Sequence, residues 1–77
     1  MVTRTTNFYL AAVFLSEGAE LIGIDKSDMR HLKFEFDGKD LTQLEFQWDH
    51  RMLQVNARSY SEAIKDIKMK IHQVIGE

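Results

Sequence analysis

The chain has 77 residues and contains no cysteine, which excludes disulfide bonds and metal sites built on thiolates. A chain of this length buries only about 60–65% of the surface that its unfolded form exposes, so its folding is only marginally favourable. Its formal net charge of −2 is unlike the strongly basic balance of most nucleic-acid-binding proteins. The longest apolar run, residues 8–15, is much shorter than the roughly 20 residues of a membrane-spanning helix, and no signal-peptide pattern is present. We therefore expect a single domain over residues 1–77, located in the cytoplasm.

The first predicted element is a helix over residues 7–17. Residues 5–7 (Thr-Thr-Asn) supply possible N-caps, and Gly18 stands where a glycine commonly ends a helix. Apolar side chains cover nearly the whole circumference, because after Asn7 only the last two residues, Ser16 and Glu17, are polar. Such a helix must be covered on more than one side. Either it is the central core element of the domain, or a partner protein or a second copy covers part of it.

A hairpin is predicted next. Residues 20–25 (ELIGID) are apolar and rich in isoleucine, and the polar residues 26–30 suit a hairpin loop. Residues 31–37 (HLKFEFD) alternate between apolar and polar side chains, which is the period of a strand with one buried face. Gly38 then marks the turn that leaves the hairpin.

Residues 40–49 allow two interpretations. As a helix capped by Asp40, the segment places Leu41, Leu44 and Trp48 on one stripe. As a strand, Leu44, Phe46 and Trp48 alternate. We favour the helix, followed by a short strand over residues 52–56.

The C-terminal helix is the clearest prediction. Ser59 and Glu62 have the spacing of a capping box, in which each side chain bonds to the backbone N–H of the other residue. Apolar residues at helical spacing then extend to Gly76, which is expected to end the helix. The predicted order is α-β-β-α-β-α, and the fold class is α+β, with a small antiparallel sheet of two to three strands and three helices.

The sequence offers no catalytic or metal-binding arrangement. His31, His50 and His72 belong to three different predicted elements, and no serine stands in a nucleophile elbow. The acidic residues of segment 37–40 lack the further oxygen ligands of a calcium loop. We therefore expect no enzymatic activity, no cofactor and no metal.

One candidate interaction surface is apolar. The first helix has more apolar surface than a small domain easily covers, and Phe46 points away from the apolar stripe of its own predicted helix. A protein partner or a second copy of the chain, in a homodimer, would cover this surface. The candidate partner-binding residues are Tyr9, Leu10, Val13, Phe14 and Phe46.

A second candidate surface is basic. Lys65, Lys68 and His72 fall on one stripe of the C-terminal helix together with Ser61, and Arg58 precedes them. This stripe could contact a nucleotide, another anion or nucleic acid. The same pattern is typical of an ordinary solvated helix face, which is the interpretation we favour because the protein as a whole is acidic.

Three segments form a recognisable pattern: residues 5–12 (TTNFYLAA) with Gly18, the strand 30–36, and residues 63–68 (AIKDIK). In this pattern the chain resembles a family of short domains of unknown function from bacteriophages and bacterial mobile elements. The family often has Val-Asp-Pro before the last helix, where this chain has Val-Asn-Ala at 55–57. The resemblance implies a phage or mobile-element setting and favours a helix over 40–49, but it implies no catalytic residues.

Together these patterns predict a small non-enzymatic accessory protein of the phage type, acting as a protein-binding or self-associating module. The alternative is nucleotide, anion or nucleic-acid binding through the basic stripe.

Overall fold

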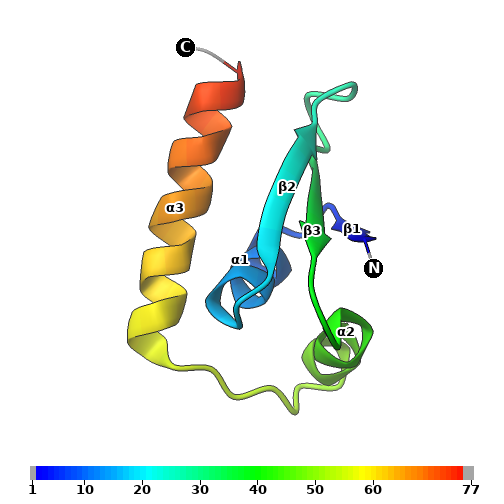
Figure 1. The fold of residues 1–77 in the computed structure, drawn as a ribbon, viewed down its shortest axis with the longest axis vertical. Coiled ribbons are helices and arrows are strands. Elements are labelled where there is room, and N and C mark those ends of the chain that lie inside the picture. The colour runs from blue at the N-terminus through cyan, green and yellow to red at the C-terminus, as the bar shows by residue number, and fades with distance from the viewer. Residues whose placement is uncertain (1, 76–77) are drawn as a thin grey trace.

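A computed structural model describes residues 2–75, which form one antiparallel sheet of three strands and three helices (Figure 1). The fold class α+β is confirmed, but the order of elements is β-α-β-β-α-α. In chain order the elements are β1 (Val2–Thr5), α1 (Phe8–Ser16), β2 (Glu20–Asp25), β3 (Lys33–Asp37), α2 (Leu41–Asp49) and α3 (Ala57–Ile75).

The third strand lies at the start of the chain. β1 pairs with β3 in antiparallel orientation, and β2 pairs with the other side of β3, so the strand order is β1-β3-β2. The strand predicted over residues 52–56 is wrong, because that segment has no regular structure. β3 also begins at Lys33 rather than at residue 31, so the hairpin loop is longer than predicted. The central position of β3 explains its clear alternation, since Phe34 and Phe36 on one face are both buried.

A β-bulge lets β2 present its large side chains to the core. Leu21 pairs with Phe36 and Ile24 pairs with Phe34, although Leu21 and Ile24 are three residues apart. A regular strand would point them to opposite faces. The irregularity between Leu21 and Gly23 inserts Ile22 as an extra residue and restores both partners to the core face.

Capping interactions define α1 much as predicted. The Asn7 side-chain oxygen accepts hydrogen bonds from the backbone N–H groups of Tyr9 and Leu10. At the other end Gly18 has φ +97°, and the N–H of Ala19 bonds to the carbonyl of Phe14. This is the Schellman arrangement, which favours glycine because other residues are strained at positive φ.

The structure answers the question of what covers α1. Leu10, Val13 and Phe14 are all buried within the single chain. On one side the Phe14 ring meets Phe36 of the sheet edge-to-face, with centroids 5.4 Å apart. On another side α1 packs against α3, whose Ile67 is fully buried. α1 is therefore the central core element, and the hypothesis that these three residues meet a partner is wrong.

The predicted helix over 40–49 is confirmed as α2. Leu41 is buried, and Leu44 and Trp48 pack against the core, as the helical stripe predicts. The capping role predicted for Asp40 is wrong. Asp40 has φ 61°, and its side chain makes no capping hydrogen bond.

α3 begins three residues earlier than predicted, because its N-cap is Asn56 rather than Ser59. The Asn56 side chain accepts a hydrogen bond from the Ser59 backbone N–H, so Ser59 already lies inside the helix. Glu62 faces Arg58 one turn back instead of closing a capping box with Ser59. Gly76, the predicted end, lies outside the described residues. α3 runs beside β2 (Figure 1), and Lys26 of the hairpin loop donates a hydrogen bond to the Val74 carbonyl near the end of the helix.

Candidate protein-binding surface

Two of the five predicted partner-binding residues remain accessible. Tyr9 is 56% exposed and Phe46 is 54% exposed, whereas the other three form core. Tyr9 lies at the start of α1, where its ring meets Phe8 edge-to-face and its carbonyl lies 3.5 Å from the Tyr60 hydroxyl. Phe46 lies on α2, so the two exposed aromatic residues belong to different helices.

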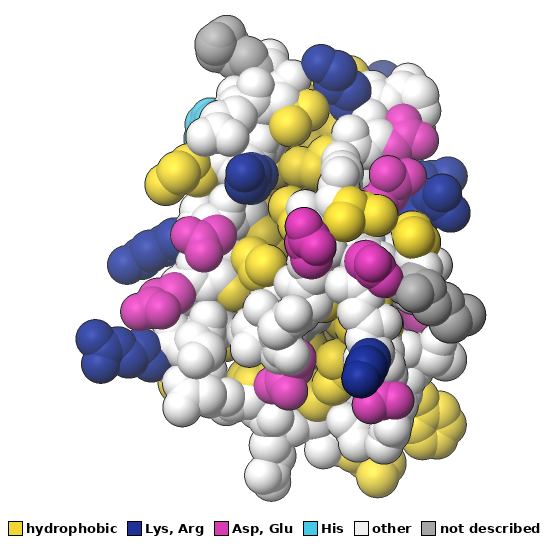
Figure 2. All heavy atoms as spheres, in the orientation of Figure 1, with side chains coloured by type: hydrophobic (Ala, Val, Ile, Leu, Met, Phe, Trp, Pro, Cys, Tyr) yellow, Lys and Arg dark blue, Asp and Glu magenta, His cyan; other side chains and the backbone are white. Residues whose placement is uncertain are grey.

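Phe46 belongs to a larger exposed surface at the end of α2. Trp48 and its stripe face the core, which leaves the opposite side of the helix and the turn after it in solvent. We call this the α2 surface, and its residues are Phe46, Asp49, His50, Arg51 and Met52. Figure 2 shows hydrophobic side chains protruding at the lower right of the molecule, where α2 lies.

Phe46 is held in place by its neighbour one turn on. The His50 ring stacks on the Phe46 ring, with centroids 4.0 Å apart and an angle of 24° between the ring planes. Nδ1 of His50 also lies 2.8 Å from the Phe46 carbonyl oxygen, within hydrogen-bond distance. These contacts reduce the rotamer freedom of Phe46, so binding a partner would cost less side-chain entropy.

A tight turn brings Met52 to the same surface. Arg51 has φ 57°, the N–H of Arg51 bonds to the Trp48 carbonyl, and the N–H of Met52 bonds to the Gln47 carbonyl. This is again a Schellman turn, here with arginine at the position that favours glycine. The turn leaves Met52 65% exposed, the highest value among the exposed large hydrophobic residues of the described chain.

A surface cavity adjoins this turn. Its volume is about 440 Å³, and it is lined by Trp48, Arg51 and Leu53. Trp48 and Leu53 are only half-buried, so the cavity exposes apolar wall beneath an arginine. Aromatic, methionine and arginine side chains are the types enriched at protein–protein interfaces. The sequence pattern indicates Phe46 but neither Met52, which falls in the predicted strand 52–56, nor Arg51, whose positive φ has no sequence signal.

The residues of the predicted basic stripe lie on one helix and in solvent. Ser61, Lys65, Lys68 and His72 are all exposed on α3. Arg58, just before them, has its Nε 3.6 Å from a Glu62 carboxylate oxygen, and both side chains are largely in solvent. Asp66 is exposed within the same helix, so acidic groups accompany the stripe.

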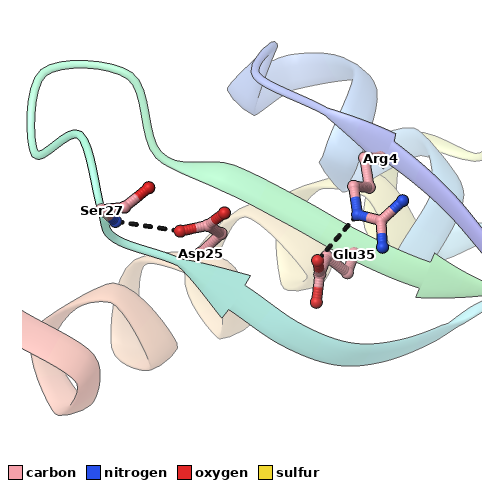
Figure 3. Close-up of polar contacts among 4 residues, drawn as sticks. All are labelled: Arg4, Asp25, Ser27 and Glu35. Carbon is pink, nitrogen blue, oxygen red and sulfur yellow. Dashed lines mark hydrogen bonds and ion pairs between the residues drawn. The ribbon is translucent and has the colours of Figure 1, made fainter.

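The sheet face away from the helices carries charges that sequence analysis did not single out. The register places two cations and four carboxylates on this face: Arg4, Lys33, Glu20, Asp25, Glu35 and Asp37. Arg4 Nε bonds to Glu35 at 2.8 Å (Figure 3). Hydrogen bonding to the Ser27 backbone N–H lowers the pKa of Asp25, and nearby Lys33 and Arg4 add to the effect. This pattern is typical of a solvated sheet face.

The three histidines lie on different parts of the fold. His31 precedes β3, His50 ends α2, and His72 lies on α3. Among residues 2–75, no group of three or more histidine, aspartate or glutamate side chains is placed to hold a metal ion. None of the helices in that range is long and apolar enough to cross a membrane.

Comparison with known proteins did not identify a relative. The chain matches no family model, no curated protein and no solved structure.

Proposed function

We propose that this chain is a non-enzymatic protein-binding module and that it binds through the α2 surface. The observation that carries the proposal is the exposure of Phe46 and Met52, at 54% and 65%, in a domain whose core is otherwise filled by its own chain. Full burial of a phenylalanine or methionine contributes about 1.5–3 kcal/mol. Because Phe46 and Met52 remain 54% and 65% exposed, only about half of this free energy is left for a partner to gain.

The geometry of the surface supports binding over a purely solvated role. The Phe46 ring stacks on the His50 ring, and a cavity lined by Trp48, Arg51 and Leu53 adjoins the turn that follows the helix. A central apolar contact with charged residues around it is the usual anatomy of an interface. Asp49 and Arg51 supply such charges.

We further propose a setting in the cytoplasm of a bacterial host, as part of a phage or mobile element. The support for this setting is the resemblance carried by residues 5–12, Gly18 and residues 63–68. In such a setting the chain would act by occupying its partner in a fixed ratio.

The test is a photo-crosslinking amino acid at position 46, with position 73 as the matched control. Gln73 is exposed on α3 and lies outside the α2 surface. In extracts of cells that express the chain, we expect discrete protein adducts from position 46 and none from position 73. Equal or absent labelling at the two positions would overturn the proposal.

The alternative function is anion or nucleotide binding by the basic stripe. The observation in its favour is that Lys65, Lys68 and His72 are all exposed on one helix. Fluorescence titration of a short labelled oligonucleotide tests it, because binding through lysines weakens steeply as salt rises. No binding at about 50 mM salt would exclude this alternative.

A further inference from the structure

We infer that the partner that fits the α2 surface is a second copy of this chain, related by a two-fold axis. This inference rests on the proposed function and names its partner. In a two-fold dimer each residue of one copy meets the corresponding patch of the other, so the surface must be complementary to itself. The α2 surface meets this requirement in its charges, because it carries one acidic and one basic residue.

The charges balance within the surface. Asp49 and Arg51 carry opposite charges, lie two residues apart at the end of α2, and are both exposed. When two copies face each other about an axis near Phe46, Asp49 of one copy lies opposite Arg51 of the other, and the reverse pair forms as well. Two copies of a patch with charges of one sign would repel each other. The α2 surface avoids this repulsion because Asp49 and Arg51 have opposite charges.

The two exposed large apolar residues of the α2 surface are Phe46 and Met52. In the dimer, Phe46 and Met52 would pack against the same residues of the second copy. Both side chains, which are more than half exposed in the single chain, would then be less exposed. Two edge strands also exist, but α3 runs beside β2, and β1 has only four residues. A short edge strand such as β1, and an edge with a helix alongside it, are poor sites for pairing with another chain. The α2 surface is therefore the better site for self-association.

The expected dimer is small and reversible. Five side chains on each copy make an interface below about 1,200 Å² in total, which is the size of weak or transient complexes. We expect a dissociation constant on the order of 10–100 µM. Sedimentation equilibrium over a concentration series measures it.

Two variants test whether the apolar residues form the contact. Phe46→Ala should weaken the dimer at least about tenfold, because central aromatic residues contribute most of the binding free energy. Met69→Ala is the matched control, since Met69 is 59% exposed but lies on α3. A dimer that Phe46→Ala leaves unchanged would overturn the inference.

A charge exchange tests the two-fold geometry. Asp49→Arg and Arg51→Asp should each be monomeric alone, because like charges then face each other across the axis. Mixed in equal amounts, the two variants should form a heterodimer in which both charge pairs are again opposite. Circular dichroism confirms that each variant is folded. Failure of the mixture to associate would overturn the proposed geometry.

The outcome also separates this inference from the proposed function. A wild-type chain that stays monomeric up to about 500 µM would overturn the second copy as partner, since even weak dimers populate at that concentration. Crosslinking from position 46 to a different protein would then still support the binding module. Loss of position-specific crosslinking would instead overturn the proposed function itself.

Discussion

Arg51 is the residue whose backbone conformation least suits its side chain. It has φ 57° at the position after α2, where glycine is favoured and other residues are strained. Arg51→Gly should raise the free energy of unfolding by about 0.5–1 kcal/mol, despite the greater freedom of glycine in the unfolded chain. Urea unfolding monitored by circular dichroism measures the change.

The matched control is Gly18→Ala, at the equivalent turn after α1. An added Cβ there would meet nothing within 4 Å, so the cost comes from the backbone at φ +97° alone. We expect a loss of about 1 kcal/mol. If Arg51→Gly lowered the free energy of unfolding, the arginine side chain would stabilise the turn by more than its backbone strain costs.

Tyr60 makes stability depend on pH in the alkaline range. Burial raises the pKa of its hydroxyl above the ordinary value, and the nearby Tyr9 adds to the effect. The folded state therefore favours the neutral form, and this contribution is complete below about pH 10 and is lost as pH rises through the folded-state pKa.

The Tyr60→Phe variant tests this dependence. Above pH 10 the wild type should lose stability relative to the variant, because the unfolded tyrosine ionises first. The two proteins are compared by unfolding in urea at a series of pH values between 8 and 11. Parallel curves over that range would contradict the assignment to Tyr60.

At the scale of elements, the start of α3 provides a direct contrast between sequence and structure. The sequence predicts a cap at Ser59, whereas the structure uses the side chain of Asn56. Asn56→Ala should lower the free energy of unfolding by about 1 kcal/mol, and Ser59→Ala should change it by less than about 0.5 kcal/mol. If Ser59→Ala were instead the more destabilising variant in thermal or urea unfolding, the capping box at Ser59 would be supported.

Elements with strong periodicity are predictable from this sequence, and short ones are not. The alternation at Phe34 and Phe36 arises because β3 is central, and the apolar character of α1 arises because the sheet and α3 bury most of it. β1 has only four residues, and its pairs with β3 join residues 29 (Thr5 and Phe34) to 35 (Val2 and Asp37) positions apart in sequence. Local patterns cannot reveal such a contact, whereas the apolar residues of segment 52–56 resemble a strand locally.

The candidate surface also contains residues that local sequence pattern predicts and residues that it does not. Phe46 could be predicted because it departs from the apolar stripe of its own helix. Met52 and Arg51 depend on the turn after α2, whose positive φ at an arginine has no sequence signal. Conversely, Leu10, Val13 and Phe14 look like a binding face in the sequence, since local pattern does not show that α3 and the sheet both cover α1.

At the scale of the whole molecule, the core depends on α1. Phe14 is fully buried and in contact with Phe36, so Phe14→Ala should lower the free energy of unfolding by about 3–5 kcal/mol. A domain of this size has little more than that in total. Circular dichroism and size-exclusion chromatography should therefore show a largely unfolded chain, and a variant close to wild type in stability would contradict the central role of α1.

The central claim is that Phe46 and Met52 serve binding rather than folding. It is tested most directly by the free energy of unfolding of the Phe46→Ala/Met52→Ala double variant in urea, at about 1 µM, where a weak dimer is dissociated. The account predicts a value within about 1.5 kcal/mol of wild type, because both side chains are largely in solvent. A loss of about 3–5 kcal/mol, as expected for Phe14→Ala, would place both residues in the core and contradict the claim.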